Sequence, residues 1–136
     1  MDLGLKGKWA LVGGASKGLG LGCARALVRE GVNVLMVARG AEQLQASAAK
    51  VIADYADFTG AAVDFIAQDI TTEAGRAAIF ERRSAFDIVV TNAGGPPPGD
   101  FRDWDRTAWI KVLDANMLTP IALIQATVDG MAARGF

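Results

Sequence analysis

The chain has 136 residues, of which 51% are hydrophobic and 21% charged, and its net charge is −1. This composition is too apolar for a disordered protein and too neutral for a protein that binds nucleic acid or an anionic membrane surface. No apolar run approaches the roughly 20 residues that span a bilayer, and the first eight residues lack the apolar core of a signal peptide.

The chain contains one cysteine, Cys23, and no histidine. Histidine-based catalytic triads and histidine metal sites are therefore excluded, and one thiolate cannot build a metal site. We expect no bound metal. A lone cysteine also rules out an internal disulfide, which is typical of a reducing compartment, and we expect a cytoplasmic protein.

Short apolar runs alternate with longer helical patterns along the chain. The short runs predict strands at 9–13, 33–38, 62–67 and 88–91. The spacing of apolar residues predicts helices at 18–30, 41–59, 72–84 and about 105–134. Because strands that are apolar throughout and separated by helices form parallel sheets covered on both faces, we predict an α/β fold. It is a Rossmann-like, doubly wound parallel sheet that forms one domain over residues 1–136.

The same spacing predicts which helix faces are buried. The predicted buried face of the first helix carries Leu19, Cys23, Ala26 and Leu27. The predicted buried face of the second helix carries Leu44, Ala48, Val51, Tyr55 and Phe58.

A glycine-rich turn joins the first predicted strand to the first helix. Its pattern is G-x-x-x-G-x-G, which differs from both the usual dinucleotide pattern G-x-G-x-x-G and the P-loop. Glycines at such a turn allow the backbone to approach a pyrophosphate, whose charge meets the positive end of the helix. A merely tight turn is the alternative. The candidate cofactor-binding residues here are Gly14, Ser16, Lys17, Gly18, Leu19 and Gly20.

The end of the second predicted strand bears on the type of cofactor. A carboxylate there binds the ribose 2′-hydroxyl of NAD, whereas an arginine accommodates the 2′-phosphate of NADP. The strand ends in Arg39, and Lys17 lies in the glycine turn that precedes the first helix. Two cations without a carboxylate favour NADP over NAD. The alternative is that both are solvated surface charges.

Polar and small residues also follow the third and fourth predicted strands. Asp69 can accept a hydrogen bond from an adenine amino group or cap the following helix, and Ile70 comes directly after it. Asn92 can tie its strand to a neighbour through its amide. Ala93 and Gly94 then allow a flat ligand to lie against the backbone at the carboxyl end of the sheet.

These motifs together resemble the classical short-chain dehydrogenase/reductase family over the whole chain. Residues 13–20 resemble the family's glycine motif, and Asp69 with Ile70 resembles its Asp-Val-type pair. Residues 91–94 resemble its Asn-Asn-Ala-Gly motif. Gly13 and Thr91 depart from the family's threonine and asparagine. Similar proteins with the Gly-Gly-Pro-Pro-Pro loop at 94–98 are often called 3-oxoacyl-carrier-protein reductases. The resemblance implies binding of NADP through Lys17 and Arg39.

The resemblance also implies that Asn116 is the helical asparagine of the active site. Pro120 lies four residues later and has no N–H for the Asn116 carbonyl. That carbonyl can hold a water of a proton relay, or the proline can mark an ordinary kink between two helices. Both interpretations stay open from the sequence.

Residues 118–131 are apolar on more than one helical face. Such a helix is buried by more than its own sheet, and in the resembled family it packs against a partner subunit. We therefore expect a homo-oligomer, a dimer or tetramer, formed through this helix.

Family catalysis also requires a Tyr-x-x-x-Lys pair with a nearby serine. The only tyrosine is Tyr55, on the apolar face of a helix, and residue 59 is a threonine. We therefore expect a fragment that ends after the helix following the fourth strand, holds the cofactor-binding half and is inactive alone. The complete protein would transfer a hydride between nicotinamide and a small carbonyl or alcohol substrate. The alternatives are a non-catalytic dinucleotide-binding module, half of a split protein, or an interaction protein with a degenerate site.

Overall fold

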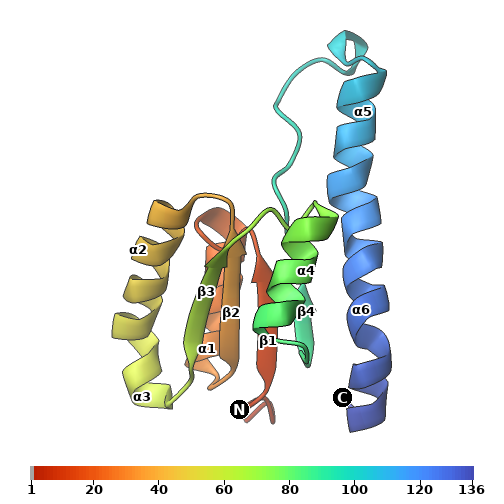
Figure 1. Cartoon of the computed structure of the whole chain (residues 1–136). Helices are drawn as coiled ribbons and strands as arrows, with labels where there is room; N and C mark the ends of the chain where they lie inside the picture. Colours follow the sequence, from red (N-terminus) through yellow and green to blue (C-terminus); the bar gives the residue numbers. More distant parts are fainter. Residues whose placement is uncertain (1) are drawn as a thin grey trace.

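The computed structural model describes residues 2–136, and its centre is a parallel sheet of four strands (Figure 1). The strands are β1 (Trp9–Gly13), β2 (Asn33–Ala38), β3 (Val63–Ala67) and β4 (Ile88–Val90). Their order is β3-β2-β1-β4, and the β1–β2 register pairs Leu11 with Leu35. The chain thus moves outward from β1 in one direction and then crosses to its other side. This crossover confirms the Rossmann-like prediction.

Helices cover both faces of the sheet. On one face α1 (Gly18–Arg29) and α2 (Ala41–Val51) pack on the first core cluster, which includes Val12, Val34 and Met36. On the other face α4 (Glu73–Arg82) and α6 (Thr119–Arg134) pack on a second cluster that contains Leu11, Leu35 and Val37. Alternate residues of each strand therefore supply two separate cores, as expected for a sheet buried on both sides.

The predicted buried face of α1 is wrong at Leu19, Cys23 and Ala26, whereas Leu27 is half-buried against the first core cluster. Gly20, Ala24 and Val28 are the buried residues, whereas Leu19 is 83% exposed and Cys23 is also exposed. The face that meets the sheet is made of small residues because the helix lies very close to the glycine turn. Apolar spacing alone favoured the larger side chains.

The second predicted helix is interrupted. After α2 the chain forms a π-helical segment, η1 (Ile52–Ala56), and a last short turn, α3 (Asp57–Thr59), which ends at Gly60. A π-helix has an extra residue per turn, so it shifts the buried face. Ala56 is therefore buried, whereas Phe58 is 87% exposed, against the prediction.

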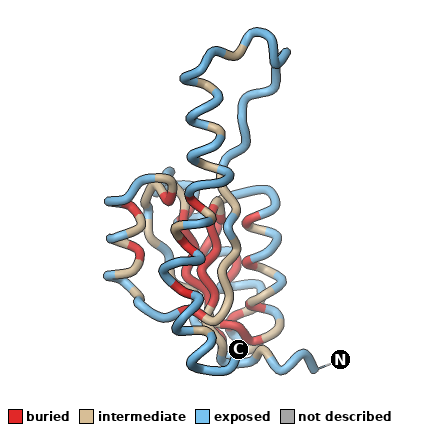
Figure 2. Tube along the Cα trace, turned by 90° about the vertical axis from the view of Figure 1, so that its right-hand side faces the viewer, coloured by how far each residue is buried: buried red, intermediate tan, exposed pale blue. Residues whose placement is uncertain are grey.

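The last helical region shows no boundary between two helices at Pro120, which was one of the two interpretations that the sequence left open. A short 3₁₀ turn, η2 (Phe101–Asp103), precedes a continuous helix of α5 (Arg106–Leu113), the π-helical segment η3 (Asp114–Leu118) and α6. In α6 the buried residues are Thr119, Leu123 and Thr127. Figure 2 shows that the part of this region beyond the sheet is largely exposed.

The continuous helix Arg106–Arg134 spans 29 residues and is long and apolar enough, by length and composition, to cross a membrane. The expectation that no segment approaches this length is wrong by that criterion. Leu123 of this helix is fully buried against the sheet, but only 11% of the apolar 18-residue stretch of the helix is buried.

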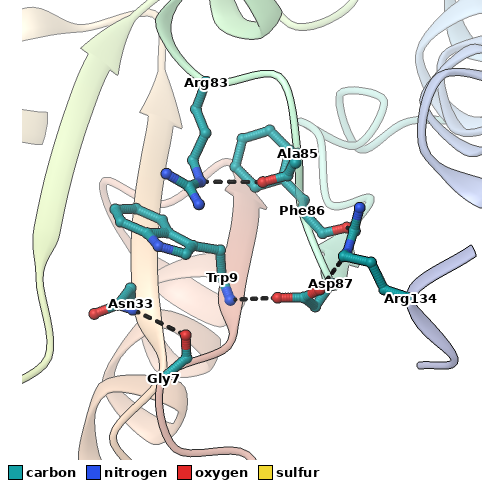
Figure 3. Close-up of polar contacts among 8 residues, drawn as sticks. All are labelled: Gly7, Trp9, Asn33, Arg83, Ala85, Phe86, Asp87 and Arg134. Atoms are coloured by element: carbon teal, nitrogen blue, oxygen red, sulfur yellow. Dashed lines mark hydrogen bonds and ion pairs between the residues drawn. The ribbon is translucent and has the colours of Figure 1, made fainter. Parts of the chain in front are cut away.

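A polar clasp anchors the end of α6 to the start of the sheet (Figure 3). Asp87 accepts hydrogen bonds from the Trp9 backbone N–H and from Nε of Arg134, both at 2.9 Å. Arg134 Nη2 also donates to the Phe86 carbonyl at 2.6 Å. Burial raises the pKa of Asp87, but its bonds to Trp9 and Arg134 outweigh burial and lower that pKa overall. The clasp therefore favours the ionised carboxylate and positions the helix that carries Asn116.

Candidate functional site

A cleft of about 1360 Å³ lies at the carboxyl ends of the parallel strands. Open α/β sheets bind ligands at this position, where the strand order reverses. Of the predicted site residues only Gly20, which is buried in α1, does not line the cleft. The residues that do line it are Gly14, Ser16, Lys17, Gly18, Leu19, Arg39, Asp69, Ile70, Asn92, Ala93, Gly94 and Asn116.

The glycine turn forms one wall of this cleft. Gly14 has a φ of +59°, a conformation that L side chains rarely adopt. A Cβ on Gly20 would lie 2.2 Å from the Gly14 carbonyl oxygen, so α1 can approach the turn only because residue 20 is glycine. The turn is fixed further by the Ser47 hydroxyl, which donates to the Ser16 carbonyl at 2.7 Å. This rigid backbone leads directly into the N-terminus of α1, which favours negative charge.

Asn92 ties β4 to the glycine turn. Its Nδ2 donates to the Gly13 carbonyl at 3.2 Å, as predicted for a structural amide. A Cβ on Gly13 would lie 2.3 Å from the Asn92 carbonyl oxygen. The glycine at position 13, which departs from the resembled motif, thus matches an unusually close approach of the two strand ends.

The sequence left two roles open for Asp69, and one of them, the cap of the following helix, is taken by Thr72. Thr72 is the N-cap of α4, because its hydroxyl accepts from the Gly75 N–H at 3.0 Å. Asp69 Oδ1 accepts from the backbone N–H and the hydroxyl of Thr71, at 3.0 and 2.7 Å. The Thr71 hydroxyl lowers the pKa of Asp69 most, against an opposing effect of burial. The Asp69 carboxylate is therefore held in place at the cleft.

Cationic side chains reach the cleft from three elements. Lys17 lies at the N-cap of α1 and Arg39 directly after β2. The guanidinium of Arg39 approaches the loop that follows β4, with Nη2 at 3.9 Å from the point where a Cβ on Gly94 would lie. Lys111 of α5 also lines the cleft, and with Arg39 it contributes to the lowered pKa of Asp69. Lys111 was not among the site residues predicted from the sequence.

The wall opposite the glycine turn was also missed. It consists of residues from the loop after β4 and from α5: Gly95, Pro96, Pro97, Trp104, Ala108 and Val112. Trp104 packs on Trp109 with ring centroids 5.2 Å apart, which fixes the start of α5. Nothing in the sequence of the Gly-Pro loop at 94–98 showed that it lines the cleft.

Asn116 lies in η3 at the edge of the cleft. Its Nδ2 donates to the Val112 carbonyl at 3.1 Å, and the Thr119 N–H bonds to Asp114 in the π-helical pattern. The helix is thus widened at this residue rather than broken at Pro120. Tyr55, by contrast, lies in η1 and does not line the cleft.

Comparison with known proteins links this geometry to one family. The family model described as "short chain dehydrogenase" matches residues 8–136. Gluconate 5-dehydrogenase of Gluconobacter oxydans is 32% identical over 131 residues, covering 96% of this chain and 51% of that protein. The rhamnolipid-biosynthesis 3-oxoacyl-[acyl-carrier-protein] reductase of Pseudomonas aeruginosa is 32% identical over 125 residues, covering 89% and 46%.

A solved structure shares the arrangement. L-sorbose reductase from Gluconobacter frateurii, complexed with NADPH and L-sorbose, superposes with a TM-score of 0.86 at 28% identity. The match covers 99% of this chain and 51% of that one. The chain therefore spans about half the length of the relatives that it matches.

Proposed function

The chain belongs to the short chain dehydrogenase family, and we propose that it is the cofactor-binding half of a cytoplasmic, NADP-dependent oxidoreductase. The complete protein would transfer a hydride between the nicotinamide and a small carbonyl or alcohol substrate. The matched relatives carry oxidoreductase names, which supports this class of activity.

The observation that carries the proposal is the charge pattern at one end of the cleft. Arg39 follows β2 where an NAD-binding unit has a carboxylate, and Lys17, in the glycine turn, lines the same cleft. Arginine and lysine both bind phosphate through charge-assisted hydrogen bonds. The NADPH bound by the sorbose reductase supports the same choice of cofactor.

The residues present fit a dinucleotide because Gly18 lines the cleft and a Cβ on it would meet nothing within 4 Å, which leaves open space at the start of α1. The turn at Ser16–Leu19 and the N-terminus of α1 would hold the pyrophosphate. Lys17 and Arg39 would hold the 2′-phosphate, and Asp69 and Ile70 the adenine. Asn92, Ala93 and Gly94 would form the surface against which the middle of the cofactor lies.

The nicotinamide, when bound, supplies the hydride chemistry. The chain's own residues orient the cofactor, and Asn116 contributes a backbone carbonyl that can hold a water at the cleft. The widened hydrogen-bond pattern of η3 and the missing N–H of Pro120 support this relay role.

Replacement of Arg39 by aspartate tests the choice of cofactor. In the complete protein, Arg39→Asp is expected to exchange the preference for NADPH over NADH, because the carboxylate repels the 2′-phosphate and accepts from a 2′-hydroxyl. Lys50→Asp makes the same charge change at an exposed site of α2 and is the control. An unchanged ratio of the two dissociation constants in Arg39→Asp would defeat the proposal.

A non-catalytic dinucleotide-binding module is the second candidate, because the only tyrosine, Tyr55, lies outside the cleft. The coding sequence that follows codon 136 separates the two. A serine followed by Tyr-x-x-x-Lys within a few tens of residues supports the enzyme, and the lack of that pattern supports the module.

We also propose that residues 118–131 form a contact with a second subunit. Ile121, Ile124 and Val128 are between 42 and 52% exposed on α6, and a groove of about 430 Å³ runs between α6 and β4. Ile124→Glu should weaken the oligomer in sedimentation velocity, whereas Gln125→Glu, at an exposed neighbouring position, should not. Equal sedimentation of both variants with wild type would exclude this face.

A further inference from the structure

A buried hydroxyl in α2 connects this helix to the glycine turn. Ser47 is 6% exposed, and its buried neighbours along the helix are aliphatic. Its hydroxyl donates to the Ser16 carbonyl at 2.7 Å and accepts from Nε2 of Gln43 at 3.3 Å. A buried hydroxyl costs free energy unless it is hydrogen-bonded, and this one is bonded as both donor and acceptor. Ser47 therefore holds the backbone of the turn and the side chain of Gln43 at once.

The bond to Ser16 also determines how the amide of Gln43 is turned. A hydroxyl has a single hydrogen, and that of Ser47 is used on the Ser16 carbonyl, so Ser47 can only accept from Gln43. Gln43 therefore presents its NH2 group to Ser47 and retains a second N–H. Gln43 lies in the first turn of α2 and lines the cleft, so this N–H is available to a ligand there.

These two hydrogen bonds join the two segments that carry the cations of the proposed 2′-phosphate site. Lys17 directly follows Ser16 in the glycine turn, and Arg39 directly precedes Gly40, the N-cap of α2. Lys17, Arg39, Gly40 and Gln43 all line the same cleft. The Ala15 N–H also donates to the Val37 carbonyl at 3.0 Å, which fixes the same turn on β2. The turn and the start of α2 are therefore held together by printed contacts on both sides of the cations.

We propose that Gln43 is a further contact for the 2′-phosphate and that Ser47 is the positioning residue that holds Gln43 and the glycine turn in place. This inference rests on the proposed NADP function. An amide N–H donates to a phosphate oxygen, and an amide that is already bonded to Ser47 loses little conformational freedom when the phosphate binds. Ser47 does not line the cleft, so it acts only through Gln43 and Ser16.

Equilibrium titration of the complete protein with NADPH and with NADH tests the contact of Gln43. The ratio of the two dissociation constants isolates the 2′-phosphate, because the rest of the cofactor is the same. Gln43→Met keeps the length of the side chain but removes the amide, and it is expected to lower the preference for NADPH about threefold to tenfold. Gln45→Met, at an exposed position of the same helix outside the cleft, is the control and should leave the ratio unchanged.

Ser47→Ala tests the positioning role. Without the hydroxyl the amide of Gln43 is free to turn, so the preference for NADPH should fall about threefold. The Ser16 carbonyl also loses its donor, so the affinity for NADH should fall about threefold, which Gln43→Met should not cause. Ser47→Thr keeps the hydroxyl and should retain the wild-type ratio. A general loss of stability would lower both affinities equally and would not change the ratio.

The double variant shows whether Ser47 acts on the 2′-phosphate through Gln43. In Gln43→Met/Ser47→Ala the ratio should equal that of Gln43→Met alone. A further drop in the double variant overturns the positioning role of Ser47, as does an unchanged ratio in Ser47→Ala. An unchanged ratio in Gln43→Met overturns the whole inference but leaves the NADP proposal standing. A wild-type ratio near one instead refutes the NADP proposal, and the role of Gln43 with it.

Discussion

The close packing of α1 on the glycine turn makes a sharp prediction about Gly20. A Cβ at this position would lie 2.2 Å from the Gly14 carbonyl oxygen, 2.6 Å from its carbon and 2.7 Å from the Gly13 oxygen. All three are backbone atoms, so no side chain can rotate away. To reach an ordinary contact of 3.4 Å the turn must move by about 1 Å.

Gly20→Ala is therefore expected to destabilise the protein. Overpacking of this kind costs about 1–3 kcal/mol, and the better helix propensity of alanine returns about 0.5–1 kcal/mol. The net loss in the free energy of unfolding is about 0–2.5 kcal/mol, with its centre near 1 kcal/mol. Because the Gly14 carbonyl is displaced, the affinity for NADPH should also fall by at least about tenfold.

Gly22→Ala is the matched control, because it lies in the same helix and its Cβ would meet nothing within 4 Å. It should stabilise the protein by about 0.5–1 kcal/mol and leave NADPH binding unchanged. Urea unfolding and equilibrium titration of the complete protein measure both quantities. If Gly20→Ala is as stable as Gly22→Ala and binds NADPH equally well, the packing argument is wrong.

Three further predictions concern other parts of the structure. Thr72→Ala should lower the free energy of unfolding by about 1 kcal/mol in urea because α4 loses its N-cap, whereas Thr72→Ser should restore it. Folding lowers the pKa of Asp87, so the clasp should stabilise the folded protein at pH values above the ordinary aspartate pKa. This contribution to the free energy of unfolding should be lost as the pH falls through the lowered pKa. Asp87→Asn should flatten that acid limb of the stability profile, and an identical limb in both proteins would contradict the clasp. Residues 1–136 expressed alone should self-associate because β4 is a sheet edge beside an apolar helix face, and a monodisperse monomer in sedimentation would refute this.

Much of the sheet and the cleft was predictable because their signals are short and local. The strands are runs of mainly apolar residues, with Asn33 at the start of β2 and Asp64 within β3, and each strand end lies within one residue of its predicted position. The cleft residues follow the strands at fixed spacings, and parallel strands bring their carboxyl ends to one edge. Asp69, Asn92 and Arg39 therefore line the same cleft although they are far apart in sequence.

The errors arose where packing overrides apolar spacing. In α1 the sheet contact uses Gly20 and Ala24, which carry little hydrophobic signal, and the larger Leu19 is left exposed. Lys111 was missed for a different reason. Its place at the cleft depends on how the loop after β4 folds back, which is a tertiary property that no local pattern encodes.

The two π-helical segments show why position, and not sequence alone, gives a residue its role. In η1 the extra residue moves Ala56 into the core and Phe58 into solvent, which is a change of packing only. In η3 the same distortion lies beside the cleft, where Asp114, Ala115 and Asn116 form part of the lining. A π-helical turn alters only the packing when its backbone groups face the core, whereas the same turn can offer those groups to a ligand when they face a binding site. The proline at 120 suggested a distortion at Asn116, and the structure places that distortion beside the cleft.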